Sequence, residues 1–433
     1  MEINLPGIVD AAMPNRGNRN VGIISSNSGL NHNDPGFLSS DFPQSPPKLY
    51  ITAESDEFDL LTLNEWRDEG FNVEYVPMGN GGVEYKMKLE SLSRANLGPC
   101  ETYGIIAFGD VASICLNHFH TPDNNPEFKL CCLIAYYPSS HIPDTQTKFP
   151  GGIQVVVHLA NGEEVGIVKQ TQMIGIQGKK RTVRRTIGRG IGTGGSLQMA
   201  YPSYAYNATP GFAEHDLDEF DRVSAELAWS RSLAVARRAF RRDVDLESVL
   251  EKNVENKFYT RHVQQTMSSY SVHKSPHVTY IPTLTGGVGS EELTRFYSEF
   301  FVSCNPSSMK LTLLSRTIGA DRVVDELYVA FKHTQQMPWI LPALPPTNKR
   351  VEIIVVSIVT LRGGKLYHEH VYWDQASVLA QVGLLDPKLV PKEASEKGVE
   401  RLPVVGREAA RRVLRGYDGD DEGEATNELI SEF

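Results

Sequence analysis

The order of apolar and polar segments changes once along the chain, near Asp243, and this change limits the folds that the chain can adopt. Before it, from Lys48 onward, short buried-strand patterns such as KLYITA and YGIIAFGD alternate with amphipathic helix patterns such as SDEFDLLTLNEWRDEG. Strands that alternate with helices predict a mostly parallel sheet with helices on both faces. The first half is therefore expected to be an α/β domain.

In the second half the helix patterns come first and most of the strand patterns follow them. LESVLEKNVENKF, TRHVQQTMSSY and SEELTRFYSEFF precede four strand-like segments, KLTLLSRTIGA, RVVDELYVAFKHT, KRVEIIVVSIVTLRGG and KLYHEHVYWD. Helices followed by an antiparallel meander indicate an α+β unit. The expected divisions are a flexible arm over residues 1–46, an α/β domain over 47–243, an α+β domain over 244–388 and an acidic tail over 389–433.

Length and composition exclude several classes of protein. A chain of 433 residues is long enough for two domains, and 40% hydrophobic with 22% charged residues is typical of soluble globular proteins. No apolar run approaches the ~20 residues of a membrane helix. The chain has no secretory signal pattern and its five cysteines form no CxxC pair, so we expect a cytoplasmic protein with buried thiols.

Charge argues against a nucleic-acid partner, because the net charge is −10. One local exception is GKKRTVRRTIGR, Gly178 to Arg189, which has six basic residues and no acid. Its alternation predicts a solvated hairpin. The following GRGIGTGG, residues 188–195, lacks the Lys-Ser/Thr ending of a phosphate loop and is expected to be a flexible turn.

The stretch AFGDVA lies where a strand turns into a helix, the position at which an α/β-hydrolase holds its nucleophile. This turn, the order of elements and the segments HLANGEE and YAYNATPGFAEHDLDEFDRVSAELAWSRSL resemble the dienelactone hydrolase family, which uses a Cys, an Asp and a His. The resemblance implies Gly109 at the nucleophile, Glu163 or Glu164 near the acid, and Pro210 at the histidine. The first half is therefore expected to be a catalytically degenerate hydrolase domain.

A displaced nucleophile or base would change that expectation. The residues close enough in sequence are His215, Ser113 and Cys115, all several positions away from the required turn. If one of them served, the chain would be a hydrolase of a lactone or ester.

The second half carries a different resemblance. SPHVTYIPTLTGGVG, ADRVVDELYVAFKHT, ALPPTNKRVEIIVVSIVTLRGGKLYHEHVYWD and QASVLAQVGLL resemble the SnoaL-like polyketide cyclases, which have the ketosteroid-isomerase-like α+β cone, over roughly Asp245 to Asp386. The whole chain resembles fungal proteins that join both halves. The resemblance implies one apolar cavity, proton chemistry beside a carbonyl, no metal or organic cofactor, and a homodimer paired through the open face of the sheet.

The segment HEHVYWD, from His368 to Asp374, supplies the candidate catalytic residues. Strand alternation divides it into two faces. One face carries His368, His370 and Tyr372, and the other carries Glu369, Val371 and Trp373. The resemblance implies Asp374 as the acid/base, with His370 as the partner that sets its protonation and with His368 and Tyr372 beside it. Asp374 also precedes a helix pattern, so it is equally expected to cap that helix.

The expected substrate contacts come from four segments. They are His277, Tyr280, His333, Trp339 and Trp373, with Trp339 as a lid over the cavity. The function expected from these residues is a cofactor-independent cyclase or isomerase that enolises a polyketide-type metabolite and closes an aldol, lactone or pyrone ring. A non-catalytic binding or assembly protein is the remaining alternative.

Overall fold

The computed structural model describes residues 46–94, 97–98, 101–125, 127–173, 176–187, 195–272, 274–416 and 429. The arm expected over residues 1–46 lies outside them except for Pro46, and so do residues 188–194 of the expected turn. Among the described residues, those from Lys48 to Gly416 belong to one compact unit.

The first sheet is built from the α/β pattern. Its order is β2-β1-β3-β4-β6-β10-β9, and every pairing is parallel except β10 with β9. The strands are β1 (Lys48–Thr52), β2 (Asn72–Tyr75), β3 (Tyr103–Phe108), β4 (Leu130–Tyr136), β6 (Gln154–Ala160), β9 (Gly195–Ser196) and β10 (Ser203–Tyr206). This parallel sheet is compatible with the expected α/β-hydrolase arrangement.

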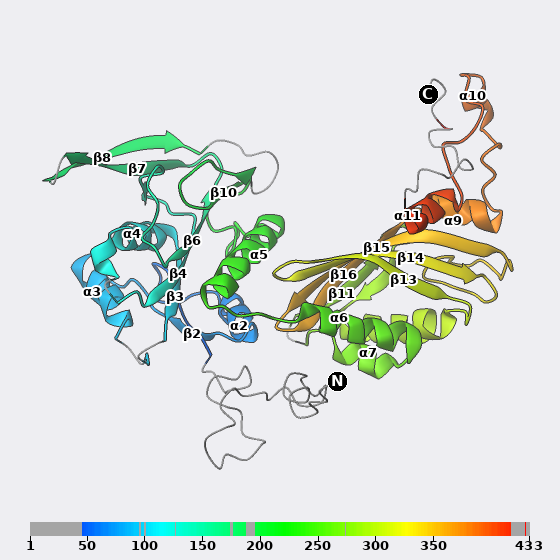
Figure 1. The fold of residues 1–433 in the computed structure, drawn as a ribbon, viewed down its shortest axis with the longest axis horizontal. Coiled ribbons are helices and arrows are strands. Elements are labelled where there is room, and N and C mark those ends of the chain that lie inside the picture. Colours follow the sequence, from blue (N-terminus) through cyan, green and yellow to red (C-terminus); the bar gives the residue numbers. More distant parts are fainter. Residues whose placement is uncertain are drawn as a thin grey trace, which may run out of the picture. The chain divides into compact units, whose positions relative to one another are not determined.

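Helices cover both faces of this sheet, and each face has its own core (Figure 1). The core on one face joins Tyr50 of β1 to α3 (Gly82–Leu92) and α4 (Gly109–Phe119). The core on the other joins Leu49 and Ile51 to α2 (Leu60–Asp68) and α5 (Arg222–Ala239). Successive residues of a strand point to opposite faces, so β1 contributes to both cores.

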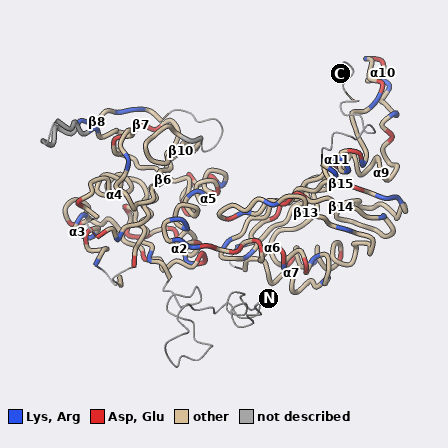
Figure 2. The backbone as a smooth tube through the Cα atoms, viewed as in Figure 1, with Lys and Arg blue, Asp and Glu red and all other residues tan. Residues whose placement is uncertain are grey.

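A hairpin of β7 (Glu164–Met173) and β8 (Ile176–Thr186) extends from this half, and β7 also pairs with β5 (His141–Pro143). The basic run expected to form a hairpin lies largely on β8, and blue marks the described basic residues of this strand in Figure 2. The hairpin prediction is confirmed.

The second sheet has the order β12-β11-β16-β15-β14-β13. All its pairings are antiparallel except that between β11 and β16. Its strands are β11 (His277–Tyr280), β12 (Thr285–Val288), β13 (Lys310–Ile318), β14 (Arg322–Lys332), β15 (Arg350–Arg362) and β16 (Lys365–Trp373). The α+β expectation for this half is confirmed.

Helices pack on one side of this sheet, and we call that side of the strands the inner face. The helices are α6 (Leu246–Val254), the π-helical turn η2 (Glu255–Tyr259), α7 (Val263–Ser268), α8 (Gly289–Arg295), the π-helical turn η3 (Phe296–Phe301) and the short η4 (Val302–Cys304). Inner-face residues such as Val278, Val355 and Val371 share one core with Leu250 and Phe301. The opposite side is the outer face.

The C-terminal segment differs from the expected tail. After α9 (Gln375–Val382), the chain forms α10 (Lys392–Ser395) and α11 (Glu408–Arg415), and α11 packs against β15 on the outer face. Arg411 donates to the buried Glu352 at 2.7 and 3.0 Å. Hydrogen bonds from Arg411 hold the pKa of Glu352 down, at about 2. Part of the segment expected to be an acidic tail is thus a docked, basic helix.

Candidate functional site

A small cavity of about 50 Å³ lies between the inner face and the helices of the second half. Its wall is mainly apolar, with four polar side chains among the lining residues. The lining residues are Leu250, Val254, Lys257, Phe258, Tyr280, Leu311, Asp325, Leu327, Val329, Trp339, Val355, Ser357, Glu369 and Val371. An apolar wall with a few convergent polar groups is the lining that small-molecule sites have, but sites for whole ligands enclose about 300–1,000 Å³.

Lys257 and Glu369 form an ion pair in this wall. The Lys257 ammonium donates to Glu369 Oε2, and the two side chains are only 2% and 9% exposed. Ser357 donates to Oε1 of the same carboxylate at 3.3 Å, and Tyr270 donates to Oε2 at 3.3 Å. Burial lowers the pKa of Lys257, while the Glu369 carboxylate opposes that change. The Glu369 carboxylate is therefore held by three donors from different elements.

Two buried tyrosines complete the cluster. The hydroxyls of Tyr270 and Tyr297 lie 2.7 Å apart, and burial raises the pKa of both phenols. The Lys257 ammonium lies 5.6 and 5.3 Å from the two ring centroids, within cation–π range. Lys257 is in η2 and Tyr297 is in η3, and π-helical turns are frequent at functional sites.

Asp325 is the second buried acid of the cavity wall. Its carboxylate accepts a forked pair of bonds from Arg316, at 2.7 and 2.8 Å. Arg316 also binds Glu247 at 2.9 Å. A bidentate guanidinium holds Asp325 as a charged, fully paired group, so we assign it a structural role.

Three expected substrate contacts lie together as an aromatic wall. Tyr280 and Trp339 line the cavity with ring centroids 5.4 Å apart, and the ring of Trp373 lies 5.7 Å from that of Trp339. The Trp339 indole donates to Asn305 Oδ1 at 2.9 Å, which satisfies its buried N–H. The wall is therefore fixed by packing and by one internal hydrogen bond.

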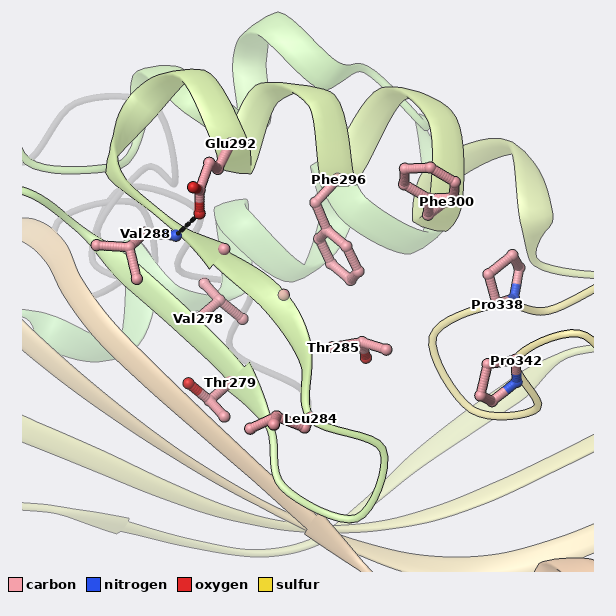
Figure 3. A pocket seen from close by; sticks show the side chains of 12 residues that line it. Val278, Thr279, Leu284, Thr285, Val288, Glu292, Phe296, Phe300, Pro338 and Pro342 are labelled. Atoms are coloured by element: carbon pink, nitrogen blue, oxygen red, sulfur yellow. Dashed lines mark hydrogen bonds between the residues drawn. The ribbon is translucent and has the colours of Figure 1, made fainter.

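Trp339 belongs to a turn from Pro338 to Pro342, which we call the Trp339 turn. The two prolines of this turn line a larger groove of about 520 Å³ (Figure 3). Its lining residues come from β11, β12, α8, η3 and the turn: Val278, Thr279, Leu284, Thr285, Gly286, Gly287, Val288, Glu292, Phe296, Phe300, Pro338 and Pro342. Pro338 and Pro342 face the groove, whereas Trp339 between them faces the cavity. The turn is thus a wall shared by both spaces, consistent in position with the expected lid.

Asp374 lies elsewhere than the resemblance implied. It is exposed and is the N-cap of α9, where its carboxylate accepts from the Ala376 N–H at 2.9 Å and from the Ser377 hydroxyl. It is not among the residues that line the cavity. The capping alternative is confirmed, and the acid that reaches the cavity from this segment is Glu369.

The three other candidates for catalysis lie on the outer face. Alternation along β16 turns His368, His370 and Tyr372 away from the cavity, because Glu369 and Val371 point into it. Tyr372 is 40% exposed. The sequence predicted correctly which residues of β16 share a face. It predicted wrongly that the face with the two histidines lines the cavity, because the face with Glu369 does so.

The two remaining histidines also lie outside the cavity wall. His277 of β11 is on the outer face beside His368, its register partner in β16. His333 follows β14 and is fully buried, with its Nδ1 3.2 Å from the Thr347 N–H. Neither side chain lines the cavity, contrary to the expected substrate contacts.

In the first half, the turn between β3 and α4 is the position of the expected nucleophile, and we call it the elbow. A neighbouring side chain occupies it. Gly109 has a φ of +59°, and the Asp110 N–H donates to Glu54 Oε1 at 2.6 Å. A Cβ at position 109 would lie 2.5 Å from the same Glu54 oxygen. The backbone donor that could stabilise an oxyanion is therefore already used, and the space for a nucleophile is filled.

The residues that could have replaced the missing nucleophile or base have other partners. Ser113 is buried and accepts from the Ser140 and His141 N–H groups, each at 3.2 Å. Burial raises the pKa of Cys115 to about 12. His215 lies 2.7 Å from Asp59 Oδ2, on the cap of α2. The described contacts of these three side chains are with other residues than Gly109, and the degenerate hydrolase domain stays a prediction.

Gly109→Ala is expected to lower the free energy of unfolding by about 1–2 kcal/mol, because a left-handed φ disfavours any Cβ. Urea unfolding measures the change, and Gly151→Ala, which meets no atom within 4 Å, is the matched control. The same substitution in a Glu54→Ala background separates the backbone effect from the contact with Glu54. Unchanged stability in both backgrounds would contradict the elbow conformation.

Comparisons with known proteins give likeness in fold over part of the chain. No family model matches the chain, and no curated protein matches it. AclR of Streptomyces galilaeus, assigned as a hydroxylase, is 16% identical with a TM-score of 0.27, covering 35% of this chain and 93% of AclR. A protein of Jannaschia sp. CCS1, assigned as a SnoaL-like polyketide cyclase, is 13% identical with a TM-score of 0.27, covering 34% and 99%.

A third solved structure is similar over a comparable part of the chain. A protein of Catenulispora acidiphila with a ketosteroid isomerase-like fold, in complex with trimethylamine, is 13% identical with a TM-score of 0.26, covering 32% of this chain and 95% of that one. The likenesses concern about a third of the chain and its fold alone.

Among the residues described, none of the helices is both long and apolar enough to cross a bilayer.

Proposed function

We propose that the cavity of the second half is the active site of a cofactor-independent acid–base enzyme, a cyclase or isomerase acting on a polyketide-type carbonyl compound. The observation that carries this proposal is the Lys257–Glu369 pair in an otherwise apolar wall. Removing two charges from water is costly, and apolar residues in their place are often neutral or stabilising. The pair is thus better explained by chemistry than by stability.

The arrangement suits proton transfer next to a carbonyl. Glu369 is the base that removes the proton from the carbon between two carbonyls, and the C–H electrons move onto the carbonyl oxygen to form an enolate. Lys257 and Tyr270, both within hydrogen-bonding distance of Glu369, are the donors that stabilise this oxygen. Donors fixed in an apolar site stabilise developing charge more strongly than water does.

Ring closure follows from the enolate without a further cofactor. In an aldol closure the enolate carbon attacks a second carbonyl of the same chain, and the new alkoxide takes the proton held by Glu369. In closure to a pyrone the enolate oxygen attacks the thioester carbonyl, the C–S bond breaks, and the departing thiolate takes that proton. A base and an acid in this geometry divide the work as in other enolising enzymes. The resemblance of HEHVYWD and its neighbouring segments to SnoaL-like cyclases supports the same class of substrate.

The volumes of the cavity and the groove indicate which part of a substrate each could hold. A cavity of about 50 Å³ admits only the reacting atoms, whereas the groove of about 520 Å³ can hold the remainder of a longer chain. Trp339 is the side chain between them, and its carbonyl accepts from Thr283 and Thr285 at 2.8 and 3.1 Å. We propose that the Trp339 turn is the lid through which the reacting end enters.

The test uses synthetic poly-β-keto thioesters offered to the intact chain in deuterated buffer. Mass spectrometry follows deuterium incorporation beside the carbonyls, the loss of water after aldol closure and the release of the thiol on closure to a pyrone. The proposal requires faster incorporation or ring closure than in buffer alone, and dependence on Lys257 and Glu369. Equal rates with the wild type and with a Lys257→Met/Glu369→Leu variant would exclude it and favour a binding protein.

We also propose that the second half forms a homodimer through its outer face. Val324, Val356 and Ile358 lie on neighbouring strands of that face and are only half-buried in the single chain. Association would cover this apolar surface. The adjacent part of the face is already covered by α11.

Val356→Glu is expected to convert the protein to a monomer, because a carboxylate in the centre of the patch would be buried unpaired. Sedimentation equilibrium at micromolar concentration measures the mass. Val83→Glu, at a 73% exposed position of α3, should leave the mass unchanged. A monomeric wild type at this concentration would refute the dimer.

A further inference from the structure

Three histidines that the cavity does not use converge on the outer face. His277 comes from β11, and His368 and His370 come from β16, which pairs with β11 in parallel. One ring nitrogen from each lies within 4.8 Å of the others. Among the described residues, this is the one group of three or more histidine, cysteine, aspartate or glutamate side chains with such spacing.

We propose that His277, His368 and His370 bind a divalent transition-metal ion of the zinc class. Residues i and i+2 of one strand point to the same face, and the register partner on the next strand supplies the third ligand. Three imidazoles are the protein ligands of one well-known type of open zinc site, which leaves a fourth position for water or another oxygen. Neutral imidazole also suits copper, nickel and iron.

The spacing of the ring nitrogens fits a tetrahedral ion. His277 Nε2 and His370 Nε2 lie 3.3 Å apart. Two nitrogens each at about 2.0–2.1 Å from zinc, at the tetrahedral angle, are separated by about 3.3 Å. The ring of His368 needs only a small side-chain rotation to join them, because the ligand atoms of the three histidines already lie within 4.8 Å of one another.

The surroundings leave the imidazoles available as ligands. Nδ1 of His368 is buried and has no hydrogen-bond partner, which is costly unless something binds there. Ligation requires the neutral form of each imidazole.

The nearby charges set the expected affinity. The charges of Arg222 and Arg322 act on His370, and their positive field opposes a divalent cation. An anionic fourth ligand, such as hydroxide or a carboxylate, would offset that field. We therefore expect affinity in the micromolar range rather than the tighter binding of a closed structural site.

This site is separate from the cavity. The histidines point to the outer face, whereas Glu369, between two of them in sequence, points to the inner face and binds Lys257. Variants of the histidines therefore test the metal site without removing the groups assigned to proton transfer. The two proposals can fail independently.

The experiment titrates Co²⁺ alone into the full-length, metal-free protein and follows the visible absorption of four-coordinate cobalt. The expected result is one Co²⁺ per chain, displaced by one Zn²⁺, with Zn²⁺ raising the thermal midpoint of the wild type. His277→Gln and His370→Gln should each weaken Co²⁺ binding by about 100-fold. His262→Gln, at an exposed helix cap outside the cluster, should bind like the wild type.

Thermal unfolding without metal shows whether each variant is folded, and the half-buried positions 277 and 370 were chosen because glutamine fills a similar volume there. The proposal is overturned if the folded wild type binds no Co²⁺ at submillimolar concentration. It is equally overturned if the folded His277→Gln/His370→Gln variant binds Co²⁺ as tightly as the wild type.

Discussion

A Glu369→Gln variant is expected to lose about 3–5 kcal/mol of unfolding free energy, because the Lys257 ammonium would be buried without its counter-ion. The side chain of Lys257 is 2% exposed, so water cannot replace the carboxylate. The alternative for Lys257 is to lose its proton, which also costs free energy at neutral pH. Urea unfolding monitored by tryptophan fluorescence measures the loss.

The control for this prediction removes both charges. Lys257→Met/Glu369→Leu replaces the pair by apolar side chains of similar length, and should recover most of the stability lost by Glu369→Gln. Additive losses in the double variant would show that the two side chains do not act as a pair. Asp374→Asn, which keeps an amide oxygen for the α9 cap, should unfold like the wild type.

Loss of turnover is the second large effect expected from this site. The Lys257→Met/Glu369→Leu variant should turn over a confirmed substrate at least about 100-fold more slowly, the order of magnitude lost with a general acid/base. Because this variant is expected to keep most of the wild-type stability, urea unfolding of the same sample shows whether the loss of turnover is separate from unfolding. Mass spectrometry of products over time gives the rate.

Asp374→Asn discriminates between the two acids of the same segment. Asp374 is exposed and bound to the α9 backbone, so its conversion to an amide should leave turnover unchanged. A 100-fold loss in Asp374→Asn with full turnover in the double variant would reverse our assignment. In that case the chemistry would lie at the strand end, outside the described cavity.

The sequence predicted the faces of β16 but not which face lines the cavity. Alternation separated His368 from Glu369 correctly, and yet both are buried, 8% and 7% exposed. In a strand with one solvent-exposed face, polar residues mark that face and apolar residues mark the face that packs on the core. Here the rings of His277 and His370 stack on that of His368 on the outer face, so both faces of β16 carry buried polar residues and polarity could not decide.

Lys257 had a local signal that was missed. Leu250, Val254 and Lys257 are spaced four and three residues apart, so they fall on one helical face, and all three line the cavity. A lysine at the end of an apolar stripe usually extends its amine to water. That it does not do so here depends on Glu369, 112 residues away, and no local pattern carries this information.

The sequence did not predict that α11 packs against the sheet, for a related reason. EAARRVLR has four charged residues of eight and is typical of a solvated helix. It docks because Arg411 pairs with Glu352, a buried acid of β15. Each partner alone resembles a surface residue, and only their pairing across 59 positions makes them part of the interior. The order of layers, by contrast, follows from local periodicity and was predictable.

The parallel pairing of β11 with β16 has a consequence for how the protein folds. It joins His277 to His368 and lies beside the Lys257–Glu369 contact, so the first helices of this half meet its last strand only after β13, β14 and β15 have been made. Closing so long a loop is entropically unfavourable until the intervening hairpins hold its ends close together. During synthesis, a chain that has emerged only as far as β15 can form the antiparallel meander but neither the acid–base cluster nor the histidine cluster. Both sites are therefore late products of folding, and a ligand for either selects chains whose sheet is complete.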